Sequence, residues 1–348
     1  MLNWFDHAGR KDLPWQQYNN NPYPVWVSEI MLQQTQVTTV IPYYLQFMQR
    51  FPTVKSLAEA SVDDVLARWS GLGYYARGRN LHKAAEVIVA EHQGQVPKTL
   101  EQLVALPGIG RSTAAAILAL TWDRPETILD GNVKRVLARY HTIEGWTGSS
   151  QTLQKLWQLA EGHTPQSRNA DYTQAIMDLG ATVCRRSRPQ CNLCPIEQTC
   201  QARITDRVGQ YPAAKPHKIK PQRHTFMLLI ANSEGELLLE KRPSTGIWGG
   251  LWSLPEVEKL PDQFGSEPVQ IAGLAIRRTS TDLPTPIKHS FTHFDLKISP
   301  ISCRLEPTGN QVMDNPDQLW YNPGRDTELG VSSAIKKVIH AYQTKLQE

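Results

Sequence analysis

Apolar residues recur at the spacing of amphipathic helices through roughly the first two hundred residues of the chain. In the segment 26–37, Trp26, Ile30 and Val37 fall at this spacing, which predicts one helix with these side chains in a core. Further helical patterns cover 61–69, 80–91, 153–159 and 175–184. The first part of the chain is therefore expected to be mostly α-helical.

The polar face of the predicted helix 26–37 carries Glu29, Gln33 and Gln36. Such residues usually form a solvated face. Glu29, however, has long apolar neighbours, and burial would raise the pKa of its carboxyl. A carboxyl that stays protonated near neutral pH is what a general acid requires. Glu29 is therefore a candidate catalytic residue.

A helix–turn–helix pattern lies at 99–120. Thr99 with Gln102 three residues later predicts a capping box that opens the first helix. The run Pro107-Gly108-Ile109-Gly110 predicts a tight turn, and the alanine-rich segment 111–120 favours a second helix. Unpaired N–H groups at the start of that helix would face outward and suit a phosphate group.

Downstream of this pattern, Asp130 stands at the start of another helix, in the run Leu129-Asp130-Gly131-Asn132-Val133. Asp is a common N-cap residue, so the structural role alone would explain it. An Asp130 that caps its helix could also present a carboxylate to a substrate. The combination with the preceding turn favours this second role.

Two glycines, Gly71 and Gly73, predict a turn that exposes Leu72, Tyr74 and nearby arginines. An apolar wedge beside cations suits insertion into a stack of bases. The alternative is that the tyrosine packs under its own loop.

Four of the five cysteines crowd into 17 residues, separated by six, two and five residues. Because no secretory signal precedes them, a metal or cluster site is favoured over disulfides. The spacing alone leaves zinc and an iron–sulfur cluster open. The candidate ligands are Cys184, Cys191, Cys194 and Cys200.

The pattern changes beyond a proline- and lysine-rich stretch at 212–222, which predicts a semi-stiff basic linker. The segments 224–232 and 236–242 flank a Ser-Glu-Gly turn and predict a β-hairpin, and 331–346 predicts a final amphipathic helix. A second, α+β part is expected.

The amino-acid composition and net charge only weakly indicate a function. The 348 residues carry a formal net charge of +4 at pH 7, which is a mildly basic balance. Between Arg185 and Arg223, nine Lys or Arg residues stand against only Glu197 and Asp206, a strip that suits nucleic acid. No segment approaches the length of a membrane span, so no membrane partner is expected.

Taken together, these motifs resemble the adenine DNA glycosylase family of the helix-hairpin-helix superfamily over essentially the whole chain. The most specific are the run 28–37, the hairpin 107–110, the run 130–133 and the cysteine loop. The resemblance implies a mostly α helix-hairpin-helix glycosylase domain at 1–211 with a 4Fe–4S cluster loop at 184–200. It also implies the linker 212–222 and an α+β, Nudix-like domain that recognises 8-oxoguanine at 223–348.

The resemblance also implies roles for individual residues. Glu29 would transfer a proton, Asp130 would stabilise the sugar cation, and Asn132 would support it, while the four cysteines would bind the 4Fe–4S cluster. The partner would be double-stranded DNA containing adenine opposite 8-oxoguanine or guanine. The expected DNA contacts are Gln34, Thr35, Leu72, Tyr74, Gly108, Ile109, Gly110, Ser112 and Lys134.

Two departures from related patterns sharpen this interpretation. Ser112 stands where glycosylases that also cut the strand carry a lysine, so a monofunctional glycosylase is expected. The acidic series of active Nudix enzymes is missing between 256 and 284. The second domain is therefore expected to recognise the DNA lesion and not to hydrolyse pyrophosphates. Phe291, Thr292 and His293 match the family's lesion-recognition loop, with Thr292 in place of a serine.

Two rival functions remain from the sequence. One is an endonuclease III-like glycosylase/lyase, which Ser112 disfavours. The other is a non-catalytic iron–sulfur DNA-binding sensor, which the pairing of Glu29 with Asp130 disfavours. We expect a monomer in the bacterial cytoplasm, associated with the nucleoid.

Overall fold

The computed structural model describes the chain except for residues 18–19, 217–218, 263, 265–266, 280–284, 307–314, 326–328 and 348. The described residues divide into two compact units. The first comprises Met1–Glu59 and Asn80–His217, and the second Ala60–Arg79 and Lys218–Glu348. The predicted domain boundaries at 211 and 223 stay a prediction.

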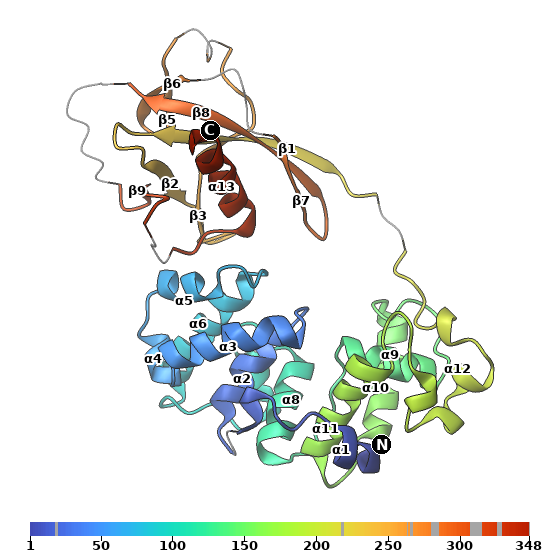
Figure 1. Ribbon diagram of the computed structural model, residues 1–348. Coiled ribbons are helices and arrows are strands. Elements are labelled where there is room, and N and C mark those ends of the chain that lie inside the picture. Colours follow the sequence, from blue (N-terminus) through green and yellow to red (C-terminus); the bar gives the residue numbers. More distant parts are fainter. Residues whose placement is uncertain are drawn as a thin grey trace. The chain divides into compact units, whose positions relative to one another are not determined.

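The first unit is built from helices (Figure 1). Their bounds are α1 Leu2–Ala8, α2 Pro22–Leu32, α3 Val37–Arg50, α4 Val54–Ala58, α6 Ala76–Glu91 (whose first four residues fall in the second unit), α7 Leu100–Ala105, α8 Arg111–Trp122, α9 Gly131–Tyr140, α10 Ser150–His163, α11 Asn169–Asp178 and α12 Gln201–Ile204. Short 3₁₀ turns occupy Pro14–Gln17, Cys191–Leu193, Glu197–Thr199 and Val208–Gln210. Throughout the described part of the chain, no helix combines the length and apolar character needed to cross a membrane.

The predicted single helix 26–37 is wrong, because the chain breaks between α2 and α3. Helix α2 ends at Leu32, and Gln34 adopts a left-handed backbone with φ of 57°. Trp26 and Ile30 are buried as expected, whereas Val37 lies in the new helix and is only half-buried. The break turns 33–36 into a loop, so Glu29 no longer shares a helix face with Gln33 and Gln36.

Helices α7 and α8 form the predicted hairpin. Thr99 caps α7 by accepting a hydrogen bond from the Gln102 backbone N–H at 3.4 Å. Gly108 has φ of +79°, and a Cβ there would lie 2.7 Å from Asn80 Cβ. Only glycine fits this turn, for both reasons. Beyond it, α8 is buried along Ala114–Ala119, where small side chains allow close packing with α2.

Helix α11 continues into a single π-helical turn at Leu179–Val183, closed by the Cys184 N–H to Leu179 O bond of 2.7 Å. Such turns are rare and cluster at functional sites. A Cβ on Gly180 would lie 2.6 Å from Asn132 Cβ. The π turn therefore brings its backbone directly against the first turn of α9.

The second unit contains a twisted sheet and the helices α5 Val62–Trp69 and α13 Ser333–Gln347. Among the described residues the main path of the sheet runs β3-β2-β1-β8-β6-β5, with β4, β7 and β9 paired at its sides. The strand bounds are β1 Gln222–Ala231, β2 Leu237–Lys241, β3 Trp252–Ser253, β4 Glu256–Val257, β5 Val269–Ile271, β6 Leu274–Arg278, β7 Ile287–Ser290, β8 Asp295–Leu305 and β9 Gln318–Tyr321.

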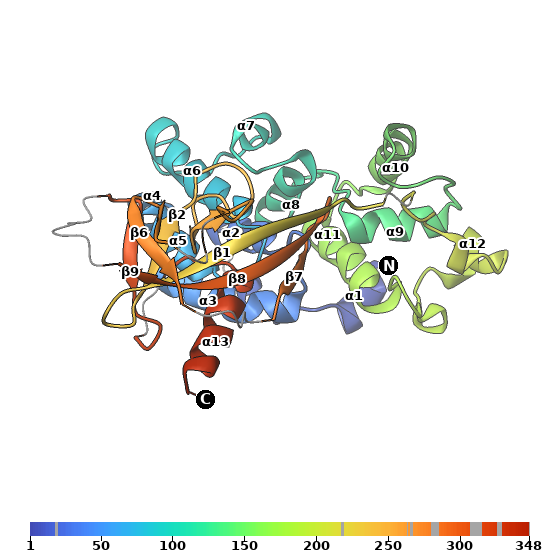
Figure 2. The same cartoon turned by 90° about the horizontal axis from the view of Figure 1, so that it is seen from above.

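The long strands β1 and β8 run parallel and side by side in both views (Figures 1 and 2), with Gln222 opposite Asp295 and Ala231 opposite Arg304. The hairpin predicted from 224–242 is confirmed as β1 and β2. The predicted final helix is confirmed as α13, whose buried side chains include Ile335 and Val338. The sheet core consists of Leu228, Ile230, Leu238, Phe264, Leu274, Ile276, Ile301 and Cys303.

Candidate functional site

A cavity of about 660 Å³ opens in the first unit, within the size range of pockets that hold small ligands. Its lining joins segments far apart in the sequence, from α2, the 33–36 loop, α8, α9 and α11. The polar side chains that face it include Arg10, Glu29, Gln33, Thr35, Ser112, Asp130, Asn132, Arg135 and Gln174. Both predicted carboxyl groups therefore face one cavity.

Glu29 lies one turn before the end of α2 and is half-buried at the cavity wall. Burial raises the pKa of its carboxyl to about 8, and repulsion by Asp130 adds to the rise. The carboxyl is therefore protonated at neutral pH and can donate a proton. The repulsion also shows that the two carboxyl groups are close enough to influence each other.

Asp130 is the N-cap of α9. Its Oδ1 accepts from the Val133 N–H at 2.7 Å, and its Oδ2 accepts from Asn132 Nδ2 at 3.2 Å. Burial raises the pKa of Asp130, while these hydrogen bonds and the nearby Arg135 charge act in the opposite direction. Asp130 can therefore cap α9 and still present its carboxylate to the cavity, which are the two roles expected of it.

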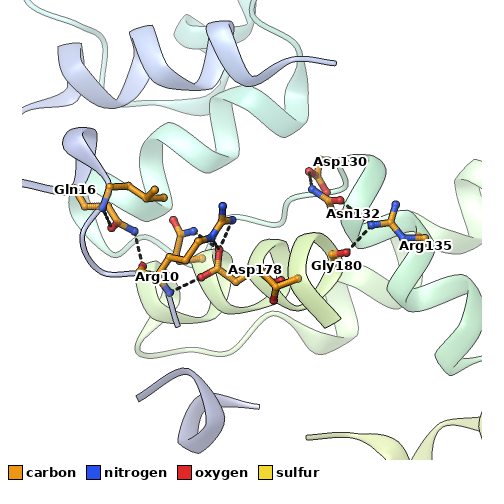
Figure 3. A network of polar contacts seen from close by, with 10 residues as sticks. Arg10, Gln16, Asp130, Asn132, Arg135, Asp178 and Gly180 are labelled. Carbon is orange, nitrogen blue, oxygen red and sulfur yellow. Dashed lines mark hydrogen bonds and ion pairs between the residues drawn. The ribbon is translucent and has the colours of Figure 1, made fainter. Parts of the chain in front are cut away.

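Arg135 connects this carboxylate to the cysteine loop, and the sequence analysis did not identify it (Figure 3). Its Nη2 donates to Asn132 Oδ1 at 2.8 Å and to Gly180 O at 2.7 Å, and its Nε donates to Cys184 O at 2.8 Å. The available signal was its position three residues after Asn132, which places both on one face of a helix.

A second polar network, also missed, lies on the other side of the cavity (Figure 3). The buried Asp178 carboxylate accepts from Arg10 Nε at 2.8 Å, from the Arg10 backbone N–H at 2.8 Å, and from Gln174 Nε2 at 2.7 Å. An ionised carboxylate only accepts, so the Gln174 amide must turn its NH₂ toward Asp178. An acidic residue inside the apolar run 175–183 was the signal for this site.

The other predicted contacts of the first unit differ in exposure. Ser112 lines the cavity, and its Oγ accepts from the Leu129 N–H at 2.9 Å. Thr35 also lines the cavity, Gln34 is exposed, and Ile109 is buried. Lys134 is absent from the described residues that line the cavity.

The glycine turn before α6 lies in the second unit. Tyr74 adopts a left-handed backbone with φ of 49°, and half of its side chain is exposed. Leu72 is buried, so its expected exposure is wrong. Arg77 is also buried, and its Nη2 donates to Gly73 O at 3.1 Å. The turn thus exposes Tyr74 and buries Leu72.

The four clustered cysteines line a separate, mainly apolar cavity in the first unit, and none forms a disulfide. Burial raises the pKa of the Cys194 thiol to about 11 and also raises that of Cys191. Among the described residues, no three His, Cys, Asp or Glu side chains are grouped so as to hold a single metal ion. All four thiols line this one cavity, so the residues present fit a centre that is bound by four thiolates.

The predicted lesion loop forms the turn between β7 and β8 in the second unit, closed by the Phe291 N–H to Phe294 O bond of 2.9 Å. The Phe291 and Phe294 rings stack with centroids 4.7 Å apart. Thr292 and His293 are exposed at the tip. The loop therefore exposes the polar side chains of Thr292 and His293 next to the stacked rings of Phe291 and Phe294.

Comparisons with known proteins agree with both units. Residues 27–161 match the family model of the HhH-GPD superfamily base excision DNA repair protein, and residues 226–341 match that of the NUDIX domain. A solved thermostable thymine-DNA glycosylase is similar in fold, with a TM-score of 0.53 and 25% identity over 59% of this chain and 93% of that chain. The predicted fold class, helix-hairpin-helix followed by Nudix-like, is confirmed.

Similarity to curated proteins extends over nearly the whole chain. The adenine DNA glycosylase of Buchnera aphidicola subsp. Acyrthosiphon pisum is 36% identical, covering 99% of this chain and 97% of its own length. That of Homo sapiens is 34% identical, covering 99% of this chain and 73% of its own length. The chain therefore belongs to the adenine DNA glycosylase family.

Proposed function

We propose that this DNA glycosylase of base excision repair hydrolyses the N-glycosidic bond of adenine mispaired with 8-oxoguanine or guanine in double-stranded DNA. The observation that carries the proposal is the pair of carboxyl groups, Glu29 and Asp130, at one cavity. The pKa of about 8 keeps Glu29 protonated at neutral pH. One carboxyl can therefore act as an acid while the other acts as an anion, as in glycoside hydrolysis.

In this mechanism Glu29 donates its proton to the departing adenine at N7, which makes the base a better leaving group. Bond cleavage leaves a positive, oxocarbenium-like sugar. Asp130 stabilises this cation, because the hydrogen bonds from Val133 and Asn132 favour its ionised form. Asn132 is held in turn by Arg135, which makes it a positioning residue.

The adenine must first leave the base stack, which requires a few kcal/mol and is easiest at a mispair. The cavity of about 660 Å³ provides room for the flipped nucleotide. Gln174 turns its NH₂ toward Asp178, so its carbonyl oxygen is left to accept from the exocyclic amino group of adenine. Tyr74, Gln34 and Thr35 would contact the duplex around the mispair.

The proposed enzyme leaves the DNA strand intact. Ser112 faces the cavity but offers a hydroxyl, which cannot form the Schiff base that strand cutting by a lyase requires. The hairpin residues Gly108, Ile109 and Gly110 and the nearby Lys134 would hold the DNA backbone. We propose that the protein acts as a monomer in the bacterial cytoplasm, at the nucleoid.

The direct test is incubation of the purified protein with a duplex carrying adenine opposite 8-oxoguanine. We expect alkali-dependent strand breaks at the adenine, since alkali reveals abasic sites. A duplex with adenine opposite thymine is the control and should stay uncut. Breaks that form without alkali would reject the monofunctional mechanism, and no breaks at all would reject the proposed activity.

We further propose that Cys184, Cys191, Cys194 and Cys200 bind a 4Fe–4S cluster. Their spacing and their shared cavity support this proposal. When bound, the cluster would supply thiolate–iron bonds that hold the cysteine loop. Anaerobically prepared protein should contain iron and sulfide in near-equal amounts, and zinc without iron would reject the cluster.

Finally, we propose that Phe291, Thr292 and His293 recognise 8-oxoguanine. The lesion differs from guanine by one added oxygen and one added N–H, so a few well-aimed hydrogen bonds can discriminate them. Replacing Phe291 and His293 by Ala should reduce the preference for 8-oxoguanine over guanine by about tenfold, with Lys288→Ala as the control on the same hairpin. An unchanged ratio of single-turnover rates would reject this role.

A further inference from the structure

Arg139, in the last turn of α9, is a buried cation whose donors are all directed at the cysteine loop and its continuation. Only 3% of the residue is exposed. Its Nε donates to Tyr211 O at 2.9 Å, its Nη1 to Arg185 O at 2.8 Å, and its Nη2 to Arg186 O at 3.2 Å. One side chain therefore gathers backbone carbonyls from both ends of the segment 185–211.

The same residue contacts two of the four cysteines. Arg139 Nη1 lies 3.3 Å from both the carbonyl oxygen and the Sγ of Cys184. The Cys200 thiol donates to Arg139 O at 3.6 Å. These are the first and last cysteines of the loop, so Arg139 touches both sides of the cysteine cavity that it lines.

The charge of Arg139 has no carboxylate partner among the described residues. Carbonyl groups satisfy its N–H groups but carry no net charge. Buried charges in proteins are normally paired, because an isolated one is expensive to remove from water. In the described part of the chain, the positive charge of Arg139 thus lies at the cysteine cavity without a paired carboxylate, since Glu197 of the same lining pairs with Arg203.

A thiolate-ligated cluster would be that anion, since its four thiolates carry more negative charge than its inorganic core carries positive charge. We propose that Arg139 is the counter-ion of the cluster, donating a charge-assisted hydrogen bond to the Cys184 thiolate. This inference rests on the proposed 4Fe–4S cluster. Hydrogen bonds to sulfur and nearby charge tune such centres, so Arg139 holds the cluster in place and raises its reduction potential.

Arg203 provides the matched comparison, because it lines the same cavity. Its side chain is 45% exposed, and its Nε lies 3.0 Å from Glu197 Oε1. Its charge is therefore both paired and screened by solvent. If proximity of any arginine were sufficient, both residues would matter equally. The structure assigns the role to Arg139 alone of these two.

The test uses full-length, cluster-loaded protein in the wild type and in Arg139→Gln, Arg139→Lys and Arg203→Gln. Three properties are measured: iron per chain, the rate at which a chelator removes the visible absorption of the cluster, and the reduction potential. Arg139→Gln should lose the cluster at least about tenfold faster than wild type and have a more negative potential. Arg203→Gln should stay within about twofold of the wild-type rate and keep its potential.

Arg139→Lys distinguishes the effect of the positive charge from that of the guanidinium shape. It also provides a second variant in case Arg139→Gln fails to fold. Lysine keeps the charge but lacks the planar fork that reaches several acceptors at once. It should therefore lose the cluster faster than wild type while its potential stays near the wild-type value.

Wild-type loss rates and potentials in both Arg139 variants would overturn the inference. A potential in Arg139→Lys as negative as that in Arg139→Gln would also overturn it, because charge would then not be the cause. Wild-type protein without iron would instead reject the underlying cluster proposal.

Discussion

The two ends of helix α9 present opposite charges to two different cavities. Asp130 caps the N-terminus and Arg139 lies in the last turn, each at the end where the helix dipole favours its charge. Their surroundings differ. Asp130 is half-buried at the wall of an open cavity, and burial raises its pKa. Arg139 is fully buried, and its N–H groups donate to several carbonyl oxygens. In our proposals, Asp130 at one end takes part in the reaction, and Arg139 at the other end holds the cluster.

Arg135 lies between these ends and contacts both sites. It donates to Asn132, which supports the Asp130 carboxylate, and to the carbonyl of Cys184. The two cavities are therefore joined by hydrogen bonds through one side chain, which Figure 3 shows beside Asn132 and Gly180. Variants at the three positions should separate a reacting site, a structural site and the link between them.

Among the variants of α9, the largest effect is expected from Asp130→Asn. An amide cannot balance the positive sugar, so single-turnover adenine release should fall by about 10²-fold or more, while iron content stays at the wild-type level. Base release and iron per chain are measured on the same preparation. If adenine release stayed within tenfold of the wild-type rate, or if iron were lost, Asp130 and Arg139 would not serve separate roles at the two ends of α9.

The pH dependence of the rate should follow the carboxyl pair. Glu29 has a pKa of about 8, so it is protonated below that pH and loses its proton above it. Adenine release should therefore fall about tenfold per unit above pH 8. At acidic pH the rate should fall again as Asp130 becomes protonated, at a pH above that of an ordinary aspartate because burial raises its pKa. Single-turnover rates across pH would show these limbs, and a flat profile through pH 9 would exclude Glu29 as the acid.

Arg135→Gln should have a smaller effect, which appears both in adenine release and in retention of the cluster. Loss of a residue that orients a catalytic or ligand group reduces activity or affinity by about 10–100-fold. We expect the lower part of this range for adenine release, together with faster loss of the cluster to a chelator. Lys155→Gln, on the exposed side of α10, serves as the control. If only one of the two properties changed, Arg135 would belong to one site and would not link them.

The smallest effect concerns stability. Because the folded-state pKa of Glu29 is raised from 4.5 to about 8, the unfolded chain releases this proton first as pH rises. Wild-type stability therefore decreases between these pH values, and Glu29→Gln should remove that decrease. The variant should unfold a few degrees higher than wild type at pH 8.5, and this gain should shrink at pH 5. Equal melting differences at both pH values would contradict the raised pKa.

Local features of the fold were predictable where local chemistry decides them. Thr99 and Asp130 cap their helices as expected, and the glycine turn of the hairpin is present. The helix break after Leu32 was not predicted, because the apolar pattern continues across it. Gln34 adopts a left-handed backbone at the break, which the apolar spacing of 26–37 does not indicate.

The long-range polar networks were not predictable from spacing. Asp178 meets Arg10 across 168 residues, and Arg139 meets Tyr211 across 72. Leu72 looked exposed because glycines flank it, but tertiary packing buries it. Residue type pointed to Glu29 and the four cysteines, whereas the residues that orient them became visible only in three dimensions.

The central claim is that Glu29 supplies the proton for adenine release. The most direct test is single-turnover release from a duplex with adenine opposite 8-oxoguanine, for wild type and Glu29→Gln, with duplex affinity measured in parallel. We predict that the variant binds the duplex with wild-type affinity and iron content but releases no detectable adenine. Adenine release at the wild-type rate by Glu29→Gln would contradict the account.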